Sequence, residues 1–193
     1  MMATTGLEGG FANAPVQSAQ TFRAVLNAMA HPGRIETVSA AQPPLPMDPA
    51  AGAMLLTLAD HETKIFLAPS VDSDAIRSWL TFHTGAPLVA SGAADFAIGH
   101  WDELLPIDQY QIGTAAYPDR SVTLVVTQPA LTDKGTVICG PGIQSTASLN
   151  IPDTALLDFN ANRSPLGIDM IMTAGDQLAA VPRSTRVFDR EKR

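Results

Sequence analysis

Basic residues, cysteine and long apolar runs are all scarce in this sequence of 193 residues. Twelve lysines and arginines stand against 19 aspartates and glutamates, and the net charge is −7. Because the phosphates of nucleic acid and an anionic membrane surface both need many cations to bind a protein, we expect neither as a partner. Cys139 is the only cysteine, so no disulfide can form within the chain. No apolar run approaches the roughly 20 residues of a membrane-spanning helix.

Signals of export and of metal binding are also missing. The first residues, MMATTGLEGGFANAP, have neither the basic nor the apolar region of a signal peptide, and no cluster of cysteine and histidine has zinc spacing. We therefore expect a cytoplasmic protein without a metal site. The length fits a single domain, 1–193, with a core over about 10–187.

The few basic residues are unevenly distributed. Residues 183–193 hold five of the twelve together with two acidic residues, a local charge of +3, so residues 1–182 carry −10. Residues 189–193 are all charged and lie at a terminus, which is typical of a segment that does not pack. We expect a flexible basic tail over 188–193.

Fourteen glycines and 15 prolines are spread over the chain and favour many short elements. Helices are expected over 16–30, over 49–58, from a cap at Asp72 or Asp74 to about 83, and from 152 to about 162. Strands are expected over 34–39, 64–68, 95–99, 122–127, 136–139, 168–173 and 178–181. This order predicts an α/β fold of three layers, α/β/α, with a mixed sheet.

Some local predictions are sharper. The first helix is expected to have one apolar face, formed at helical spacing by Phe22, Val25, Leu26 and Met29. Arg23 is placed near the buried side of that helix. The apolar run 122–127 predicts a buried central strand, with 136–139 paired to it. The turn residues at 174–177 predict a hairpin between the last two strands.

One glycine-rich turn and two histidines are candidates for binding. Gly140 and Gly142 follow an apolar strand and form either a structural turn or a backbone site for an anion; the lysine of a P-loop is missing. His61 lies in a polar connector or at the edge of a site. His83 ends a helix, where a capping or core role competes with a ligand or catalytic role. His31 and His100 are interpreted as structural.

The cysteine, lysine and arginine residues give weaker indications of a functional site. Cys139 has no basic neighbour in the sequence and is interpreted as an inert thiol. Only three lysines occur, Lys64, Lys134 and Lys192, which argues against pyridoxal phosphate (PLP) chemistry, because a Schiff base needs a desolvated lysine. Arg23, Arg34 and Arg183 could bind phosphate or phosphonate, although each alone is more typical of a surface or structural arginine. No catalytic residue is assigned. The binding candidates are His61, His83, Gly140, Gly142, Arg34 and Arg183.

A set of ordered segments carries a family resemblance. These segments are 20–26, 28–35, 56–63, 79–87, 113–114 with 117–118, 140–143, 165–169 and 182–185. Together they resemble the H-type component of the bacterial carbon–phosphorus lyase system, which degrades phosphonates. Two positions depart from the pattern: Ser164 stands where the family prefers an aromatic residue, and Ser184 stands where it prefers threonine.

The resemblance implies a fold similar to the large domain of PLP-dependent transferases, without PLP or another cofactor. It implies a homodimer that assembles with subunits G, I and J. The resemblance also implies that this chain is an accessory subunit of that complex. In this role it is needed for making α-D-ribose 1-alkylphosphonate 5-triphosphate from ATP and an alkylphosphonate, and it is not catalytic alone. The alternative is an autonomous small-molecule transferase, or a nucleotide-binding module, with a cleft near His61, His83 and Arg183. A nucleotide or a phosphonate stays open as a ligand.

Overall fold

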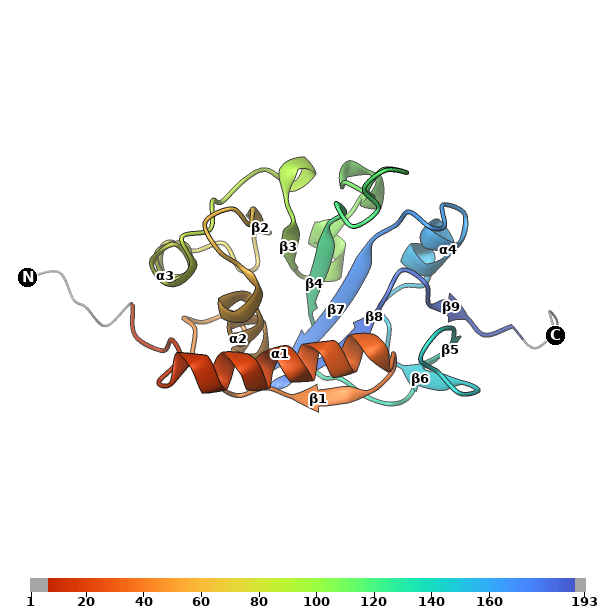
Figure 1. Ribbon diagram of the computed structural model, residues 1–193, viewed down its shortest axis with the longest axis horizontal. Coiled ribbons are helices and arrows are strands. Elements are labelled where there is room, and N and C mark those ends of the chain that lie inside the picture. Colours follow the sequence, from red (N-terminus) through yellow and green to blue (C-terminus); the bar gives the residue numbers. More distant parts are fainter. Residues whose placement is uncertain (1–6, 190–193) are drawn as a thin grey trace, which may run out of the picture.

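The computed structural model describes residues 7–189, in which a six-stranded mixed sheet lies beside a smaller sheet of three strands (Figure 1). The large sheet has the order β1 (Ile35–Thr37), β8 (Gln177–Val181), β7 (Asp169–Ala174), β4 (Thr123–Thr127), β3 (Phe96–Gly99) and β2 (Ile65–Leu67). Strands β2, β3, β4 and β7 are parallel neighbours, and β8 is antiparallel to both β7 and β1. The expected mixed sheet, the central place of β4 and the β7–β8 hairpin are therefore confirmed.

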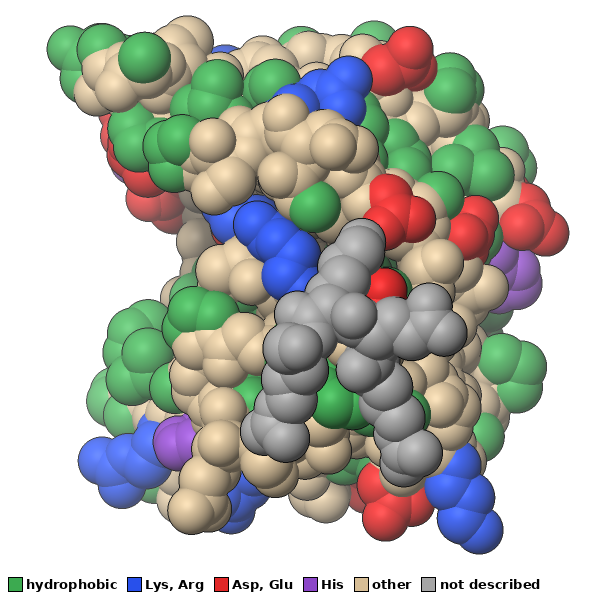
Figure 2. Space-filling view, turned by 90° about the vertical axis from the view of Figure 1, so that its right-hand side faces the viewer, with side chains coloured by type: hydrophobic (Ala, Val, Ile, Leu, Met, Phe, Trp, Pro, Cys, Tyr) green, Lys and Arg blue, Asp and Glu red, His purple; other side chains and the backbone are tan. Residues whose placement is uncertain are grey.

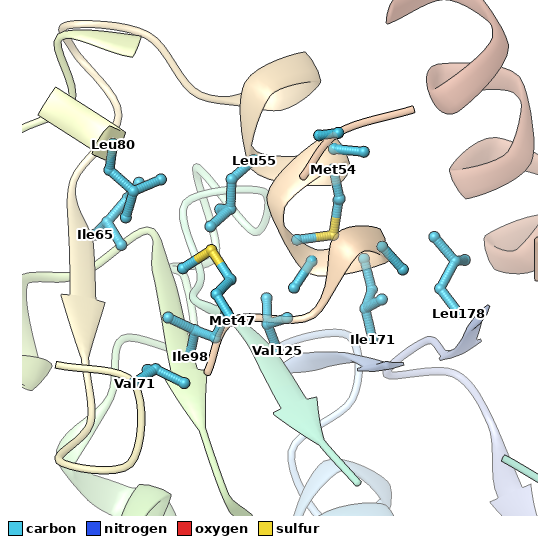
Figure 3. Close-up of a cluster of buried hydrophobic side chains, with 14 of the residues drawn as sticks. Met47, Met54, Leu55, Ile65, Val71, Leu80, Ile98, Val125, Ile171 and Leu178 are labelled. Atoms are coloured by element: carbon cyan, nitrogen blue, oxygen red, sulfur yellow. The ribbon is translucent and has the colours of Figure 1, made fainter. Parts of the chain in front are cut away.

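Three helices cover one face of this sheet (Figure 1). They are α1 (Ala14–Ala30), α2 (Pro49–Leu58) and α3 (Asp74–Thr84). Helix α1 packs against α2, β8 and β1. Helix α2 has the bounds predicted for it, and its residues 50–55 are all buried. Figure 3 shows the contact layer between this region and the strands, formed by Met47, Met54, Leu55, Ile98, Val125 and Ile171.

The opposite face carries a different layer. Alternate residues of the same strands, such as Leu124, Val126 and Met170, point into a second buried cluster, because successive side chains of a strand face opposite sides. Short 3-10 turns at Trp101–Leu104 and Ile107–Gln109, helix α4 (Ala155–Ala161) and the small sheet cover this cluster. The coarse prediction of a layered α/β fold is confirmed, whereas the second covering layer mixes turns, a sheet and one short helix.

The pairing predicted for the strand at 136–139 is wrong. This strand, β5 (Thr136–Cys139), pairs with β6 (Ala147–Leu149) and β9 (Arg186–Val187) in the small sheet. It cannot pair with β4, because β3 and β7 already occupy both edges of that strand. The third helix also begins differently, since the side chain of Ser73, rather than an aspartate, accepts the N–H of Ile76.

The apolar face predicted for α1 is only partly right. Val25 is buried, but Phe22 and Leu26 are 51% and 56% exposed. The buried side of the helix is formed instead by Thr21, Val25 and Ala28. Arg23 is exposed, not near the buried side. Helix α1 therefore has apolar residues on two sides, and one of those sides is uncovered.

At the carboxyl end of the described chain, the N–H of Phe188 donates to the carbonyl oxygen of Val137 at 2.8 Å. The expected tail, 188–193, is thus described at 188 and 189, and residues 190–193 lie outside the described residues. No helix between residues 7 and 189 is both long and apolar enough to cross a membrane.

Candidate functional site

An open cleft of about 470 Å³ lies at the carboxyl edge of the parallel strands. Since β3 and β4 run in parallel, the residues that follow them meet at one edge of the sheet, where ligands of open α/β sheets commonly bind. The volume falls in the range of about 300–1,000 Å³ that small-molecule sites occupy. The cleft is lined by Pro46, Asp48, His100, Trp101, Asp102, Thr127, Gln128, Pro129 and Pro152.

Asp48 is held in place by the β7–β8 hairpin. Its carboxylate accepts the hydroxyl of Thr173 at 2.9 Å and the N–H of Gly175 at 3.1 Å. The carbonyl oxygen of Gly175 in turn accepts the N–H of Ala50 in the first turn of α2. The sheet and the helix therefore fix this carboxylate from both sides.

The segment after β3 brings His100, Trp101 and Asp102 to the cleft. The end of β3 packs tightly, because a Cβ added at Gly99 would lie 2.4 Å from the Cβ of Ala68. The N–H of His100 lies 3.3 Å from both Ser70 Oγ and Glu103 Oε2. Trp101 is buried and opens a 3-10 turn. The carboxylate of Asp102 is exposed and bonds to no described residue.

Thr127 and Gln128 enter the cleft from the end of β4. The backbone N–H of Gln128 donates to the carbonyl oxygen of Thr173 at 2.8 Å. The side-chain amide of Gln128 donates to the sulfur of Met172 at 3.0 Å. The hydroxyl of Thr127 is buried and has no hydrogen-bond partner among residues 7–189. Because a buried polar group without a partner costs about 1–3 kcal/mol, this hydroxyl is an unusual feature of the site.

The cleft is acidic and hydrogen-bonding in character. Two aspartates and one histidine line it, and its described lining includes no lysine or arginine. A phosphate would meet carboxylates there without the guanidinium or ammonium partners that such groups normally use. No group of three metal-ligating side chains occurs within the described part of the chain. The described lining of the cleft is therefore poorly suited to bind an anion.

The six residues singled out from the sequence lie outside this cleft. The ring of His83 packs on Trp79 at a centroid distance of 4.9 Å, and its Nε2 lies 2.9 Å from the carbonyl oxygen of Leu7. Trp79 donates to the neighbouring carbonyl of Glu8. His83 thus joins α3 to the segment that precedes α1, with its ring occupied by contacts inside the protein.

His61 is exposed in the connector between α2 and β2. It lies beside the end of α3, where a Cβ added at Gly85 would be 3.4 Å from the Cβ of His61. No hydrogen bond or ring contact joins the imidazoles of His61 and His83 in the described structure. The two histidines therefore lie near the same helix end without forming one site.

Arg183 lies at the opposite end of the strands from the cleft. Its guanidinium contacts both carboxylate oxygens of Asp169, the first residue of β7, with Nε to Oδ2 at 3.1 Å. It also donates to the carbonyl oxygen of Pro118 at 2.6 Å and to the hydroxyl of Ser121. Three of the segments that carry the family resemblance, around 117, 167 and 183, meet here. The partners of Arg183 lie within the protein itself.

Gly140 and Gly142 form a tight turn, in which the carbonyl oxygen of Gly140 accepts the N–H of Ile143 at 3.1 Å. Gly142 has φ of +83°, and a Cβ there would lie 2.0 Å from the carbonyl oxygen of Ala30. The turn therefore packs against the end of α1. Arg34 is mostly exposed and pairs with Glu36 at 2.7 Å. On the visible part of this side of the molecule, Figure 2 shows lysine and arginine in separate small groups.

Sequence reasoning missed the cleft, and it interpreted His100 as structural. A signal was present: polar residues lie at the ends of two buried strands, His100 and Asp102 after the first, and Thr127 and Gln128 at the end of the second. Adjacency of those two strand ends, however, depends on the parallel order of the sheet. The strand predictions alone did not supply that order.

Comparison with known proteins gives a consistent family assignment. The family model described as "Bacterial phosphonate metabolism protein (PhnH)" matches residues 9–188. The chain is 38% identical over 188 residues to alpha-D-ribose 1-methylphosphonate 5-triphosphate synthase subunit PhnH of Rhizobium meliloti (strain 1021), covering 93% of this chain and 94% of that protein. It is 26% identical over 201 residues to the putative C-P lyase subunit protein HtxG of Stutzerimonas stutzeri, covering 93% and 95%. Because the family model matches almost the whole length of this chain, the chain belongs to the PhnH family of bacterial phosphonate metabolism proteins.

Proposed function

We propose that this chain is an accessory subunit of the carbon–phosphorus lyase core complex. In this role it is needed for making α-D-ribose 1-alkylphosphonate 5-triphosphate from ATP and an alkylphosphonate. The observation that carries the proposal is the full-length similarity to a protein named as a subunit of a ribose 1-methylphosphonate 5-triphosphate synthase. The second relative, named as a putative C-P lyase subunit, supports the same assignment.

The distribution of cations supports an accessory role. A catalyst for this reaction must hold a triphosphate and a phosphonate, and both need several basic side chains. The cleft contributes none among its described lining residues. Arg183 is engaged by Asp169 and Arg34 by Glu36. The cleft, Arg34 and Arg183 therefore offer the anionic substrates no ready site, and we assign that site to a partner subunit.

The uncovered side of α1 supports a place in a larger assembly. Val16, Phe22 and Leu26 are each about half exposed along this helix. Arg23 is the only charged residue of α1. Apolar residues spaced along one side of a helix are the usual anchors for docking into a groove of another protein. We assign this face to contact with another subunit of the complex, the candidates being subunits G, I and J.

Several finer features remain part of the proposal. The fold resembles the large domain of PLP-dependent transferases, and the protein forms a homodimer in the cytoplasm. It works without PLP or another cofactor. In support, Lys64 and Lys134 are exposed rather than desolvated, and no lysine is among the residues that line the cleft.

Co-purification tests this assignment. A tagged chain carrying Phe22→Asp and Leu26→Asp, co-expressed with subunits G, I and J, should recover far less of them than the unmodified chain does. Leu105→Asp is the matched control, since Leu105 is also exposed but follows a turn that covers the opposite face of the sheet. Equal recovery by the α1 variant and this control would reject α1 as the contact surface. Failure of the unmodified chain to recover any subunit would reject the complex itself.

A further inference from the structure

We propose that the cleft at the carboxyl edge of β3 and β4 binds the ribosyl group of an uncharged nucleoside. This inference goes beyond the accessory role, because a subunit can dock on its partners without any ligand of its own. It rests on the hydrogen-bonding groups of the cleft, on its apolar walls and on the absence of lysine and arginine from its described lining.

The hydrogen-bonding groups suit a pair of neighbouring hydroxyls. A carboxylate has two oxygens that only accept, so it can accept hydrogen bonds from two adjacent hydroxyls at once. Aspartate and glutamate bind ribose hydroxyls in this way in dinucleotide sites. Asp102 lines the cleft with a carboxylate that is exposed and bonds to no described residue. It is therefore the group best placed to receive a ribose diol.

Other polar groups around the cleft are already fixed in position. Asp48 is held by Thr173 and Gly175, and the amide nitrogen of Gln128 is held by Met172. The side-chain carbonyl oxygen of Gln128 can still accept a hydrogen bond from a hydroxyl of the ligand. A ligand in such a site meets groups whose orientation is already set, which reduces the entropy lost on binding.

The walls suit the apolar faces of a sugar and a base. The apolar residues that line the cleft beside its polar groups are Pro46, Trp101, Pro129 and Pro152. Mostly apolar walls with a few placed polar groups are typical of small-molecule sites. Prolines present rigid C–H surfaces, against which a flat ring can pack at little cost in conformational freedom.

The charge of the cleft selects against phosphate esters. Asp48 and Asp102 are its acidic lining residues, and neither forms an ion pair with a described lysine or arginine. A triphosphate entering the cleft would be repelled by both carboxylates. The part of the proposed ligand that enters the cleft therefore carries no phosphate.

Calorimetric titration of the purified full-length chain with adenosine tests the proposal. We expect saturable binding, weakened at least about tenfold for 2′-deoxyadenosine, because the site loses one of the two hydroxyls it is built to bind. ATP should bind no more tightly than adenosine. Asp102→Asn should weaken adenosine binding at least about tenfold, because the amide keeps the size but loses one accepting oxygen.

Two further variants complete the design. Gln128→Ala should also weaken adenosine binding, whereas Asp133→Asn, at an exposed position that lines a different hollow, should leave it unchanged. Thermal unfolding of each variant shows that it is folded. Absence of saturable binding at millimolar adenosine, tighter binding of ATP than of adenosine, or unchanged binding in Asp102→Asn would each overturn the proposal. These outcomes leave the accessory role untouched, because co-purification tests that role separately.

Discussion

The guanidinium of Arg183 contacts both oxygens of the Asp169 carboxylate and so ties the segment after β8 to the start of β7. The backbone N–H of Arg183 donates to the same carboxylate at 2.8 Å. Because Nη1 donates to the carbonyl oxygen of Pro118 and Nη2 also donates to the hydroxyl of Ser121, one side chain joins three separate parts of the chain. A residue singled out for phosphonate binding thus anchors the amino-terminal edge of the parallel strands.

Replacing this arginine should destabilise the fold. Arg183→Ala leaves Asp169 partly buried without its cation, which should lower the free energy of unfolding by about 2–4 kcal/mol, somewhat less than for a fully buried pair. Arg183→Lys should restore little of the lost free energy of unfolding, since an ammonium group cannot form the bidentate contact of a guanidinium with a carboxylate. Urea unfolding measures both variants. Arg77→Ala is the control, because its pair with Asp72 is more exposed and should matter much less. A similar loss in the control would contradict this account.

Tyr110 should make stability fall at high pH. Burial raises the pKa of its phenol to about 12, while the unfolded chain titrates near the ordinary value of about 10. Above pH 10 the unfolded chain therefore releases a proton that the folded chain retains, and the free energy of unfolding falls as pH rises from 10 to 12. Urea unfolding over that range should show the decline in the unmodified chain and a shallower one in Tyr110→Phe.

At neutral pH the substitution Tyr110→Phe should not lower the free energy of unfolding. The hydroxyl of Tyr110 is buried without a partner in the described structure, so removing it relieves a desolvation penalty of about 1 kcal/mol. We expect Tyr110→Phe to be as stable as the unmodified chain, or up to that amount more stable. A clear loss of stability at pH 7 would show that the hydroxyl has a partner.

The two sides of α1 should respond differently to truncation. Val25→Ala removes buried side-chain volume at a position only 6% exposed and should lower the free energy of unfolding by about 1–3 kcal/mol. Phe22→Ala removes a larger side chain from the uncovered side and should change it by less than about 0.5 kcal/mol. Chemical denaturation of the isolated chain measures both. Comparable losses would show that Phe22 is covered even in the isolated protein.

Local sequence signals were sufficient for some elements. Pro49 followed by a mostly apolar run predicts the bounds of α2, because a favourable first-turn residue and the length of the run are local signals. The turn at Gly175-Asp176 predicts the β7–β8 hairpin for the same reason. The side chain of Asp48, however, does not cap α2, because its carboxylate is bonded to Thr173 and Gly175. The wrong partner for β5 and the unrecognised cleft both concern contacts between distant segments, which periodicity does not encode.

Helix α1 shows a second limit. Its apolar residues repeat at helical spacing, yet Phe22 and Leu26 face outward while Thr21 is buried. A pattern of hydrophobicity identifies a face that avoids water, but does not say whether the chain's own core or another protein covers it. The exposed residues Phe22 and Leu26 belong to the surface that we assign to contact with a partner subunit.

Release of adenine from ATP in the presence of methylphosphonate tests the accessory role most directly. The assay compares three samples: this chain alone, its complex with subunits G, I and J supplied with any further subunit the reaction requires, and the same mixture without this chain. We predict no release by the chain alone, release by the complete mixture, and a strong loss when this chain is omitted. Adenine release by the isolated chain, or full release without it, would contradict the account.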